Sequence, residues 1–174
     1  MRLLNILSKV KCTEFIDYFD SNYNYKDKQV VGSNIIHNSE VAMNLCYKLR
    51  PLLESNIDYK LEPHQAWIRK YVRGNVLDKH WDGKADVAFS IMLGQSDNQP
   101  NPLFIYYNDI PTEIVLDVGD GYFFEGGTIE HERPPIQSDY LYGMYLGYKK
   151  INKETTVAEL KIEIEKQEKI IKSK

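Results

Sequence analysis

His80 and Asp82 are separated by one residue, and in an extended segment the side chains of such a pair point to the same face. One imidazole and one carboxylate can then reach a single metal ion. A third candidate ligand, His131, follows the turn-rich stretch Glu125–Thr128. Two histidines and one carboxylate are the facial ligand set of non-haem Fe(II) centres, which leaves three coordination positions open. The alternative is a surface His-Asp pair with an unrelated histidine.

The other two histidines, His37 and His64, have no neighbouring residue that suggests chemistry, and we interpret both as surface or structural residues. A single short motif is weak evidence by itself, so the elements around His80 and His131 decide how the motif is read.

From about Leu61 to Lys150 the sequence consists of short aromatic and β-branched runs separated by turn residues. This regular spacing predicts an antiparallel sandwich or barrel rather than βαβ units. Most of the 13 tyrosines lie here, as expected for half-buried sheet faces. The expected strands are Gln65–Arg73, Asp86–Leu93, Leu103–Tyr107, Glu113–Leu116, Gly121–Phe124 and Tyr140–Tyr148.

Residues 1–60 are expected to form flanking helices. Thr13 is a plausible cap for a first helix, and the polar stretch from Ser21 to about Asn34 is predicted to be a loop. Ser39 is the expected cap of a second helix, which Pro51 kinks or ends. Cys46 lies in the apolar stripe of this helix, so it is predicted to be a small buried hydrophobe rather than a reactive thiol.

The end of the chain, residues 153–172, is predicted to be a charged helix with a narrow apolar seam. Thr156 and Glu159 form a capping-box pattern at its start. The seam is expected to pack on its own domain, with a short dimerising coil as the alternative, so the chain is expected to be a monomer or a homodimer. The fold class predicted is α+β with a mainly β core, in a single domain over residues 1–174.

Composition excludes several classes of protein. The net charge is −3, which argues against a general nucleic-acid binder. No apolar run approaches the ~20 residues of a membrane span, and the N-terminus does not match a secretory signal. The only cysteines, Cys12 and Cys46, form no CxxC motif and suggest neither a disulfide framework nor a thiolate metal site. We therefore expect a cytoplasmic protein with no membrane or nucleic-acid partner.

Three segments carry a resemblance to a known family. The stretch Trp67–Asp82 resembles the "R-x-Y, Gly, Leu, H-x-D" entry to the β core of 2-oxoglutarate/Fe(II)-dependent oxygenases, in their prolyl-4-hydroxylase-like branch. Ser90–Gly94 resembles the second core strand of that family, and Leu116–Gly126 resembles the segment that leads to its distal histidine. The resemblance covers Gln65–Lys150, about half of the chain.

The resemblance implies a double-stranded β-helix of the jelly-roll or cupin-like type. It also implies an enzyme in which His80, Asp82 and His131 are the catalytic iron ligands, with 2-oxoglutarate and O2 as cosubstrates. The implied reaction is hydroxylation of a substrate, with release of succinate and CO2. Peptidyl or prolyl side chains are the nearest precedent for the acceptor, and small molecules stay open because a fold does not determine its substrate.

The sequence departs from the family where an Arg or Lys usually holds the far carboxylate of 2-oxoglutarate, about nine residues after the distal histidine. That position is Tyr140 here. A buried dicarboxylate needs a cationic partner, and the substitutes we predict are Arg133 and Arg69, with a hydroxyl donated by Tyr71 or Tyr142. Arg69 and its neighbour Arg73 are equally acceptable as surface residues. Four aromatic residues are expected to be core rather than pocket residues: Trp81, Tyr122, Phe124 and Tyr145.

Two other functions fit the same predicted core. One is a catalytically silent jelly-roll binding module, which the missing strand arginine favours. The other is a cupin-like metalloenzyme that does not use 2-oxoglutarate, which would require a second imidazole near His80. An alkylated-base demethylase is disfavoured by the negative charge of the chain and by the lack of an arginine pair after His131.

Overall fold

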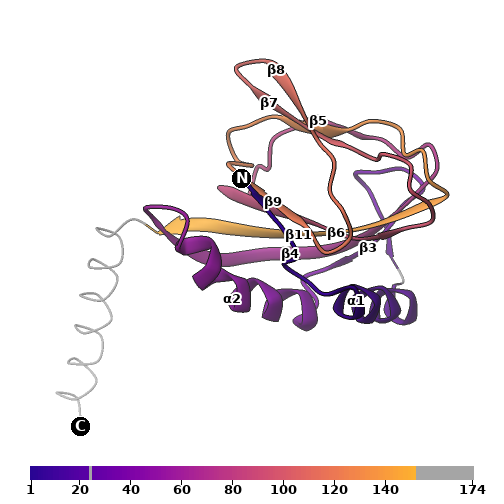
Figure 1. The fold of residues 1–174 in the computed structure, drawn as a ribbon, viewed down its shortest axis with the longest axis horizontal. Helices are drawn as coiled ribbons and strands as arrows, with labels where there is room; N and C mark the ends of the chain where they lie inside the picture. Colours follow the sequence, from indigo (N-terminus) through magenta and orange to yellow (C-terminus); the bar gives the residue numbers. More distant parts are fainter. Residues whose placement is uncertain (24, 152–174) are drawn as a thin grey trace, which may run out of the picture.

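The computed structural model describes residues 1–23 and 25–151, so the helix predicted over residues 153–172 lies outside the described residues. The described chain contains two helices and eleven strands (Figure 1). The helices are α1 (Lys9–Asn22) and α2 (Glu40–Glu54). The strands are β1 (Arg2–Leu3), β2 (Tyr25–Lys26), β3 (Asn34–His37), β4 (Lys60–Val72), β5 (Leu77–His80), β6 (Val87–Gln95), β7 (Leu103–Tyr107), β8 (Ile110–Ile114), β9 (Gly121–Phe124), β10 (His131–Arg133) and β11 (Tyr140–Ile151).

The strands form two antiparallel sheets. The large sheet has the order β1-β9-β6-β11-β4-β3-β2, and the small sheet has the order β5-β10-β7-β8. Figure 1 shows the small sheet above the large one, with both helices beneath the large sheet. Strands far apart in the sequence pair in both sheets, as in β11 with β4 and β10 with β5. The arrangement is a jelly-roll double-stranded β-helix, which confirms the predicted mainly β fold class.

Strand β4 shows how the large sheet separates two environments. Ala66 and Ile68 are fully buried in the apolar cluster that includes both helices. The alternate residues Trp67, Arg69 and Tyr71 point to the other face and line a cavity between the sheets. This period-two alternation follows from strand geometry, and it assigns one face of the sheet to packing and the other to the cavity.

Helix α1 begins earlier than the sequence predicts. Ser8 is the N-cap and accepts a hydrogen bond from the backbone N–H of Lys11, whereas Thr13 lies inside the helix and donates its hydroxyl to the carbonyl of Lys9. The expectation that Thr13 caps this helix is therefore wrong. Ser8 has the same capping chemistry one turn earlier, and the buried Phe15 and Phe19 anchor the helix on the large sheet.

Helix α2 is capped by Ser39, as predicted, through a hydrogen bond from the backbone N–H of Ala42. Pro51 lies within the helix, which continues to Glu54. Because Leu53 is fully buried against the large sheet, packing of the last turn outweighs the hydrogen bond that proline cannot donate. Cys46 is fully buried, as predicted, and burial raises the pKa of its thiol to about 12.

The two strands that carry the candidate histidines were not predicted from the sequence. β5 reads Leu-Asp-Lys-His and β10 reads His-Glu-Arg, so neither shows the alternation of apolar and polar residues that marks a half-buried strand. β8 spans Ile110–Ile114 rather than the expected Glu113–Leu116, because Asn108 and Asp109 adopt positive φ and form a tight hairpin turn directly after β7. The predicted loop Ser21–Asn34 contains β2 and the start of β3.

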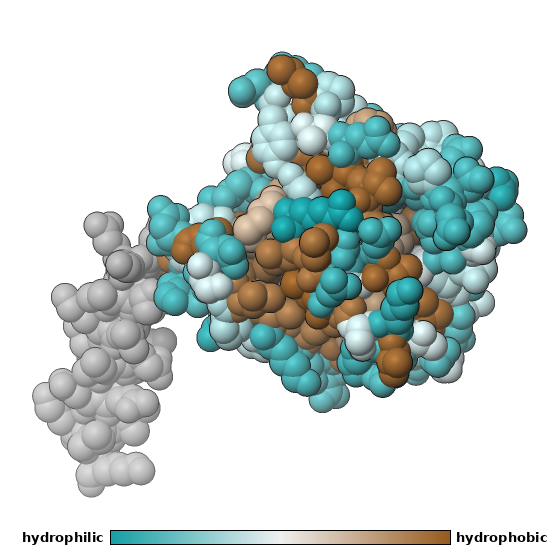
Figure 2. Space-filling view, in the orientation of Figure 1, coloured by the Kyte–Doolittle hydropathy of each residue, from teal (hydrophilic) through white to brown (hydrophobic). Residues whose placement is uncertain are grey.

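The surface seen in the view of Figure 1 carries both polar and apolar groups. Hydrophilic side chains cover most of the rim, and apolar side chains gather between the helices and the small sheet (Figure 2). Within the described residues, no helix has the length and apolar character needed to cross a membrane.

Candidate metal centre

Strand register brings the two predicted histidines together. His131 in β10 lies directly opposite His80 in β5, although the two residues are far apart in the sequence. Opposite residues in an antiparallel pair have their side chains on the same face, and the two imidazole ring centroids are 4.3 Å apart. The pairing of β5 with β10 therefore creates the first two thirds of the predicted ligand set.

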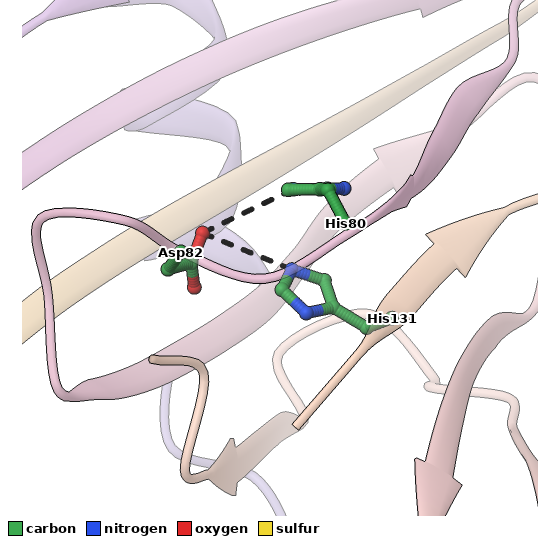
Figure 3. A group of neighbouring side chains, drawn as sticks. All are labelled: His80, Asp82 and His131. Carbon is green, nitrogen blue, oxygen red and sulfur yellow. Dashed lines mark ion pairs between the residues drawn. The ribbon is translucent and has the colours of Figure 1, made fainter. Parts of the chain in front are cut away.

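Asp82 completes the group from the loop that follows β5. Its backbone N–H donates to the carbonyl of Gly126 at 2.7 Å, which fixes the loop beside β10. Asp82 Oδ1 is 4.0 Å from His80 Nε2 and 3.8 Å from His131 Nε2, and both rings point toward it (Figure 3). The candidate ligand atoms of the three residues all lie within 4.8 Å of one another.

Both histidines are in the tautomer that leaves Nε2 available to bind a metal. His80 Nδ1 lies 2.6 Å from the carbonyl of Asp78, and His131 Nδ1 lies 3.2 Å from the carbonyl of Ile129. A carbonyl only accepts, so Nδ1 carries the proton in each neutral ring and Nε2 keeps its lone pair. Each Nε2 is the atom that faces Asp82. Backbone carbonyls commonly hold metal-bound histidines in this way.

The electrostatics of the site favour the ligand-competent protonation states. Burial, together with the neighbouring His80, lowers the pKa of His131 to about 4, and burial lowers the pKa of His80. Both rings are thus neutral near pH 7. Burial raises the pKa of Asp82 to about 6, so the carboxylate is ionised above that pH while lacking full solvation.

The Asp82 carboxylate is held at a site that fits a cation. Its Oδ2 is buried and has no hydrogen-bond partner among the described residues. A Cβ built on Gly126 would lie 2.3 Å from that oxygen, so only glycine leaves room for the carboxylate here. A buried carboxylate oxygen without a donor is costly, and coordination of a cation removes the cost. The residues present therefore fit a divalent metal ion.

The three residues line the cavity between the two sheets. Arg69 and Tyr71 line it from β4, as predicted, and the Arg69 Nη1 donates to the Tyr71 hydroxyl at 3.1 Å. Arg69 also forms an ion pair with Asp27, with Nε 2.5 Å from Oδ2, and both side chains are almost completely buried. The charge of Arg69 is therefore neutralised within the protein.

Arg133 lines the same cavity without a carboxylate partner in the described part of the chain. It is 6% exposed, and its Nη1 donates to the carbonyl of Asn101 at 2.7 Å. Burial lowers its pKa, which reflects the cost of holding a charge there. Arg133 also lines the adjoining smaller cavity, so it lies at the junction of the two. A buried cation at this place is suited to an anionic ligand.

The remaining residues considered from the sequence lie outside the cavity lining. Tyr140 is 40% exposed and packs against Tyr142, whose hydroxyl donates to Asp20 near the helices. Arg73 forms an exposed ion pair with Asp139. None of these three side chains reaches the group formed by His80, Asp82 and His131.

The expectation that the four aromatic residues belong only to the core is wrong for three of them, because two line the cavity and Trp81 lies at the surface. Phe124 and Tyr145 line the cavity, and Tyr145 stacks on Trp67 with ring centroids 3.8 Å apart. Trp81 is 58% exposed, and Tyr122 packs beside Phe124 outside the cavity lining. Aromatic residues on a strand are buried on either face of a sheet, so residue type alone does not distinguish core from pocket.

Asp27 and Gln29 are the site residues that sequence reasoning missed. Both lie between β2 and β3 in the stretch predicted as a loop, and both contact Arg69. The stretch has no periodicity that would have signalled a role, and its contact with β4 depends on tertiary structure.

Comparison with known proteins shows similarity in structure alone. No protein-family model matches the sequence, and no curated protein matches it. A prolyl-4-hydroxylase from Pseudomonas putida has 14% identity and a TM-score of 0.68, with 86% of this chain and 91% of that chain covered. The viral collagen prolyl hydroxylase of Paramecium bursaria Chlorella virus-1 has 15% identity and a TM-score of 0.66, with 85% and 94% covered.

HygX from Streptomyces hygroscopicus, solved with nickel, 2-oxoglutarate and hygromycin B, has 10% identity and a TM-score of 0.69, with 86% of this chain and 82% of that chain covered. These proteins differ in the molecules that their structures hold, but they have one architecture in common. The chain therefore has the double-stranded β-helix fold of the 2-oxoglutarate/Fe(II)-dependent oxygenases, including prolyl-4-hydroxylases.

Proposed function

We propose that the protein is an Fe(II)- and 2-oxoglutarate-dependent dioxygenase that hydroxylates an acceptor and releases succinate and CO2. The observation that carries the proposal is the group of His80, Asp82 and His131 in a cavity that is also lined by Arg133, which has no carboxylate partner among the described residues. Three protein ligands leave coordination positions for a bidentate cosubstrate and for dioxygen. When bound, the iron supplies the oxidative chemistry.

The placement of a metal ligand and a cation in one cavity suits a dicarboxylate. His131 and Arg133 lie two residues apart on β10 and both side chains are buried on the cavity side. We propose that Arg133 holds the far carboxylate of 2-oxoglutarate while the other end is at the metal. Arg69 and Tyr71 then form the wall of this subsite.

For the acceptor, we propose a peptidyl side chain of the prolyl type. The support is the fold similarity to two prolyl hydroxylases, one bacterial and one viral. HygX, whose structure holds hygromycin B, has the same fold, so a small-molecule acceptor is the alternative outcome of a substrate screen.

The basic test is anaerobic titration with Fe(II) and 2-oxoglutarate, followed by succinate measurement after oxygen is admitted. We expect a weak visible charge-transfer band and succinate formation, and we expect neither from the His80→Ala or Asp82→Ala variant. Metal binding without the band would indicate a metalloprotein that does not use 2-oxoglutarate. Failure to bind any divalent metal would indicate a binding module and would overturn the proposal.

The role of Arg133 is tested by comparing 2-oxoglutarate with 2-oxovalerate, which lacks the far carboxylate. We expect the wild type to bind 2-oxoglutarate at least ~100-fold more tightly, because a buried charge pair is worth several kcal/mol. Arg133→Gln should remove most of that preference. Arg73→Gln is the matched control, since Arg73 is exposed and pairs with Asp139 on the surface. An unchanged preference in Arg133→Gln would assign the far carboxylate to another residue.

A further inference from the structure

A short segment between β2 and β3 lies beside the cavity and contributes Gln29 to its lining. We call Asp27–Ser33 the strap. Its ends are joined by a hydrogen bond from the backbone N–H of Asp27 to the carbonyl of Ser33, at 3.1 Å. Ser33 also donates its hydroxyl to Asp27 Oδ2 at 2.9 Å. The same Asp27 carboxylate forms the buried ion pair with Arg69, so the strap is bound to β4 at its base.

The middle of the strap is fixed from two further directions. Val30 is fully buried in a cluster with Tyr71, Leu77 and Ile136. Asn75 donates its side-chain amide to the carbonyl of Val31 at 2.9 Å. These contacts fix the backbone of the strap on both sides of Gln29. The Gln29 side chain is exposed overall, and its position is set by its own hydrogen bonds.

Gln29 extends from the strap toward the metal group. Its Oε1 accepts a hydrogen bond from Arg69 Nη2 at 2.8 Å. Since a guanidinium only donates, this contact determines which end of the amide is oxygen. The Nε2 end therefore points inward, where it lies 3.2 Å from His80 Nε2. His80 Nδ1 faces the Asp78 carbonyl, so His80 Nε2 is an acceptor and the Gln29 amide is the donor in this contact.

His80 Nε2 is the atom that faces Asp82 and is thus the metal-binding atom of that ring. The Gln29 amide accordingly places its N–H groups beside the nitrogen through which His80 would hold a metal. Gln29 also lines a second groove on the outer side of the strap, together with Trp67 and Arg69, which line both cavities. It forms part of the partition between the metal cavity and the outside.

We propose that Gln29 is a binding residue for the metal-bound end of the cosubstrate. Once His80 Nε2 coordinates the metal, its lone pair is no longer available, and the Gln29 N–H donates instead to a carboxylate oxygen bound next to His80. Arg69 holds the amide carbonyl and Asp27 holds Arg69, so the donor is preorganised. This inference rests on the proposed function, because the ligand oxygen belongs to 2-oxoglutarate.

The first test replaces Gln29 by Met, which is similar in length and has no N–H donor. With Zn²⁺ as a metal that does not turn over, we expect 2-oxoglutarate to bind roughly tenfold more weakly to Gln29→Met, as for the loss of one hydrogen bond to a charged group. The affinity for Zn²⁺ alone should be unchanged or higher, because the Gln29 amide no longer contacts His80 Nε2. Val31→Ala is the matched control in the strap, since Val31 is 88% exposed.

The second test observes the amide directly. In ¹⁵N-labelled, Zn²⁺-loaded protein, the Gln29 side-chain NH2 signals are identified by their loss in Gln29→Met. We expect these signals to shift when 2-oxoglutarate is added. A purely structural role predicts instead that Gln29→Met lowers zinc affinity, cosubstrate affinity and thermal stability together.

The outcomes separate this inference from the proposed function. If the wild type binds 2-oxoglutarate and Gln29→Met binds it equally well, the role of Gln29 is overturned and the proposed function stands. If the Zn²⁺-loaded wild type does not bind 2-oxoglutarate, both fail. If cosubstrate binding weakens but the Gln29 NH2 signals do not shift, the donor assignment is wrong.

Discussion

At the scale of single residues, the site combines groups that are costly in an ordinary protein interior. Asp82 and Arg133 are both buried, and neither has an oppositely charged side chain as a hydrogen-bonded partner in the described chain. Buried charges are normally paired, because desolvation disfavours the charged form. Their positions beside His80 and His131 are explained if a cation and an anion bind here, each compensating one of the protein charges.

We predict that Asp82→Asn stabilises the protein when no metal is added. The folded pKa of Asp82, about 6, lies above its unfolded value, so the ionised carboxylate destabilises the folded state above pH 6. Below about pH 4 the group is protonated in both states and the penalty disappears. The gain at pH 7.5 should be about 2 to 3 kcal/mol and should vanish near pH 4, as measured by urea unfolding at the two pH values.

The same variant should lose its response to metal. Wild-type protein is expected to gain thermal stability with Ni²⁺, and less so below pH 6, because a proton on Asp82 competes with the metal. Asp82→Asn should show no such gain. Asp139→Asn is the control, since Asp139 is exposed and pairs with Arg73 on the surface. Equal stability of the wild type and Asp82→Asn at pH 7.5 would contradict the pKa argument.

Gly126 offers a second test of the geometry around Asp82. A Cβ at Gly126 would lie 2.3 Å from Asp82 Oδ2 and 2.7 Å from the Ala88 Cβ. We therefore expect Gly126→Ala to displace the carboxylate and to weaken Ni²⁺ binding by tenfold or more in calorimetric titration. Gly83→Ala is the control, because a Cβ at Gly83 meets no atom within 4 Å. Wild-type affinity in Gly126→Ala would show that the carboxylate is free to move.

At the scale of elements, the sequence predicted the apolar and aromatic strands better than the polar ones. β7 and β9 have the predicted bounds, and β4, β6 and β11 overlap the expected ranges, because apolar and aromatic residues mark them. β5 and β10 consist mainly of polar residues and exist through pairing with each other and with β7. The ligands could therefore be predicted from residue type and spacing, but the strands that hold them could not.

The short strands should depend on metal more than the long ones. β10 contributes only three residues, and His131 opposite His80 joins β10 to β5, so one ion bound to both would link the two strands. We expect chelation of the metal to speed amide hydrogen exchange in β5 and β10. Exchange in β4 and β11, which pair along their whole length, should stay unchanged. Uniform acceleration in both sheets would indicate that metal removal unfolds the whole chain.

At the scale of the whole molecule, the cavity depends on contacts that the sequence does not reveal. Arg133 was among the predicted anion-binding residues because it lies two positions after His131. Arg69 was predicted with it, but Asp27 neutralises Arg69 from a segment that had been expected to be only a loop. A partner distant in the sequence decides which of the two buried arginines can bind a ligand. Only the folded structure therefore distinguishes the role of Arg133 from that of Arg69.

The two faces of the large sheet have different roles, and this affects how sequences with this fold can change. On β4, Ala66 and Ile68 pack toward the helices, whereas Trp67, Arg69 and Tyr71 line the cavity. Substitutions on the inner surface can therefore alter what enters without disturbing the apolar layer that keeps the chain folded. Such independence accounts for a backbone held in common by proteins that are only 10 to 15% identical. The residues that line the cavity are therefore the part of this scaffold that can vary most freely.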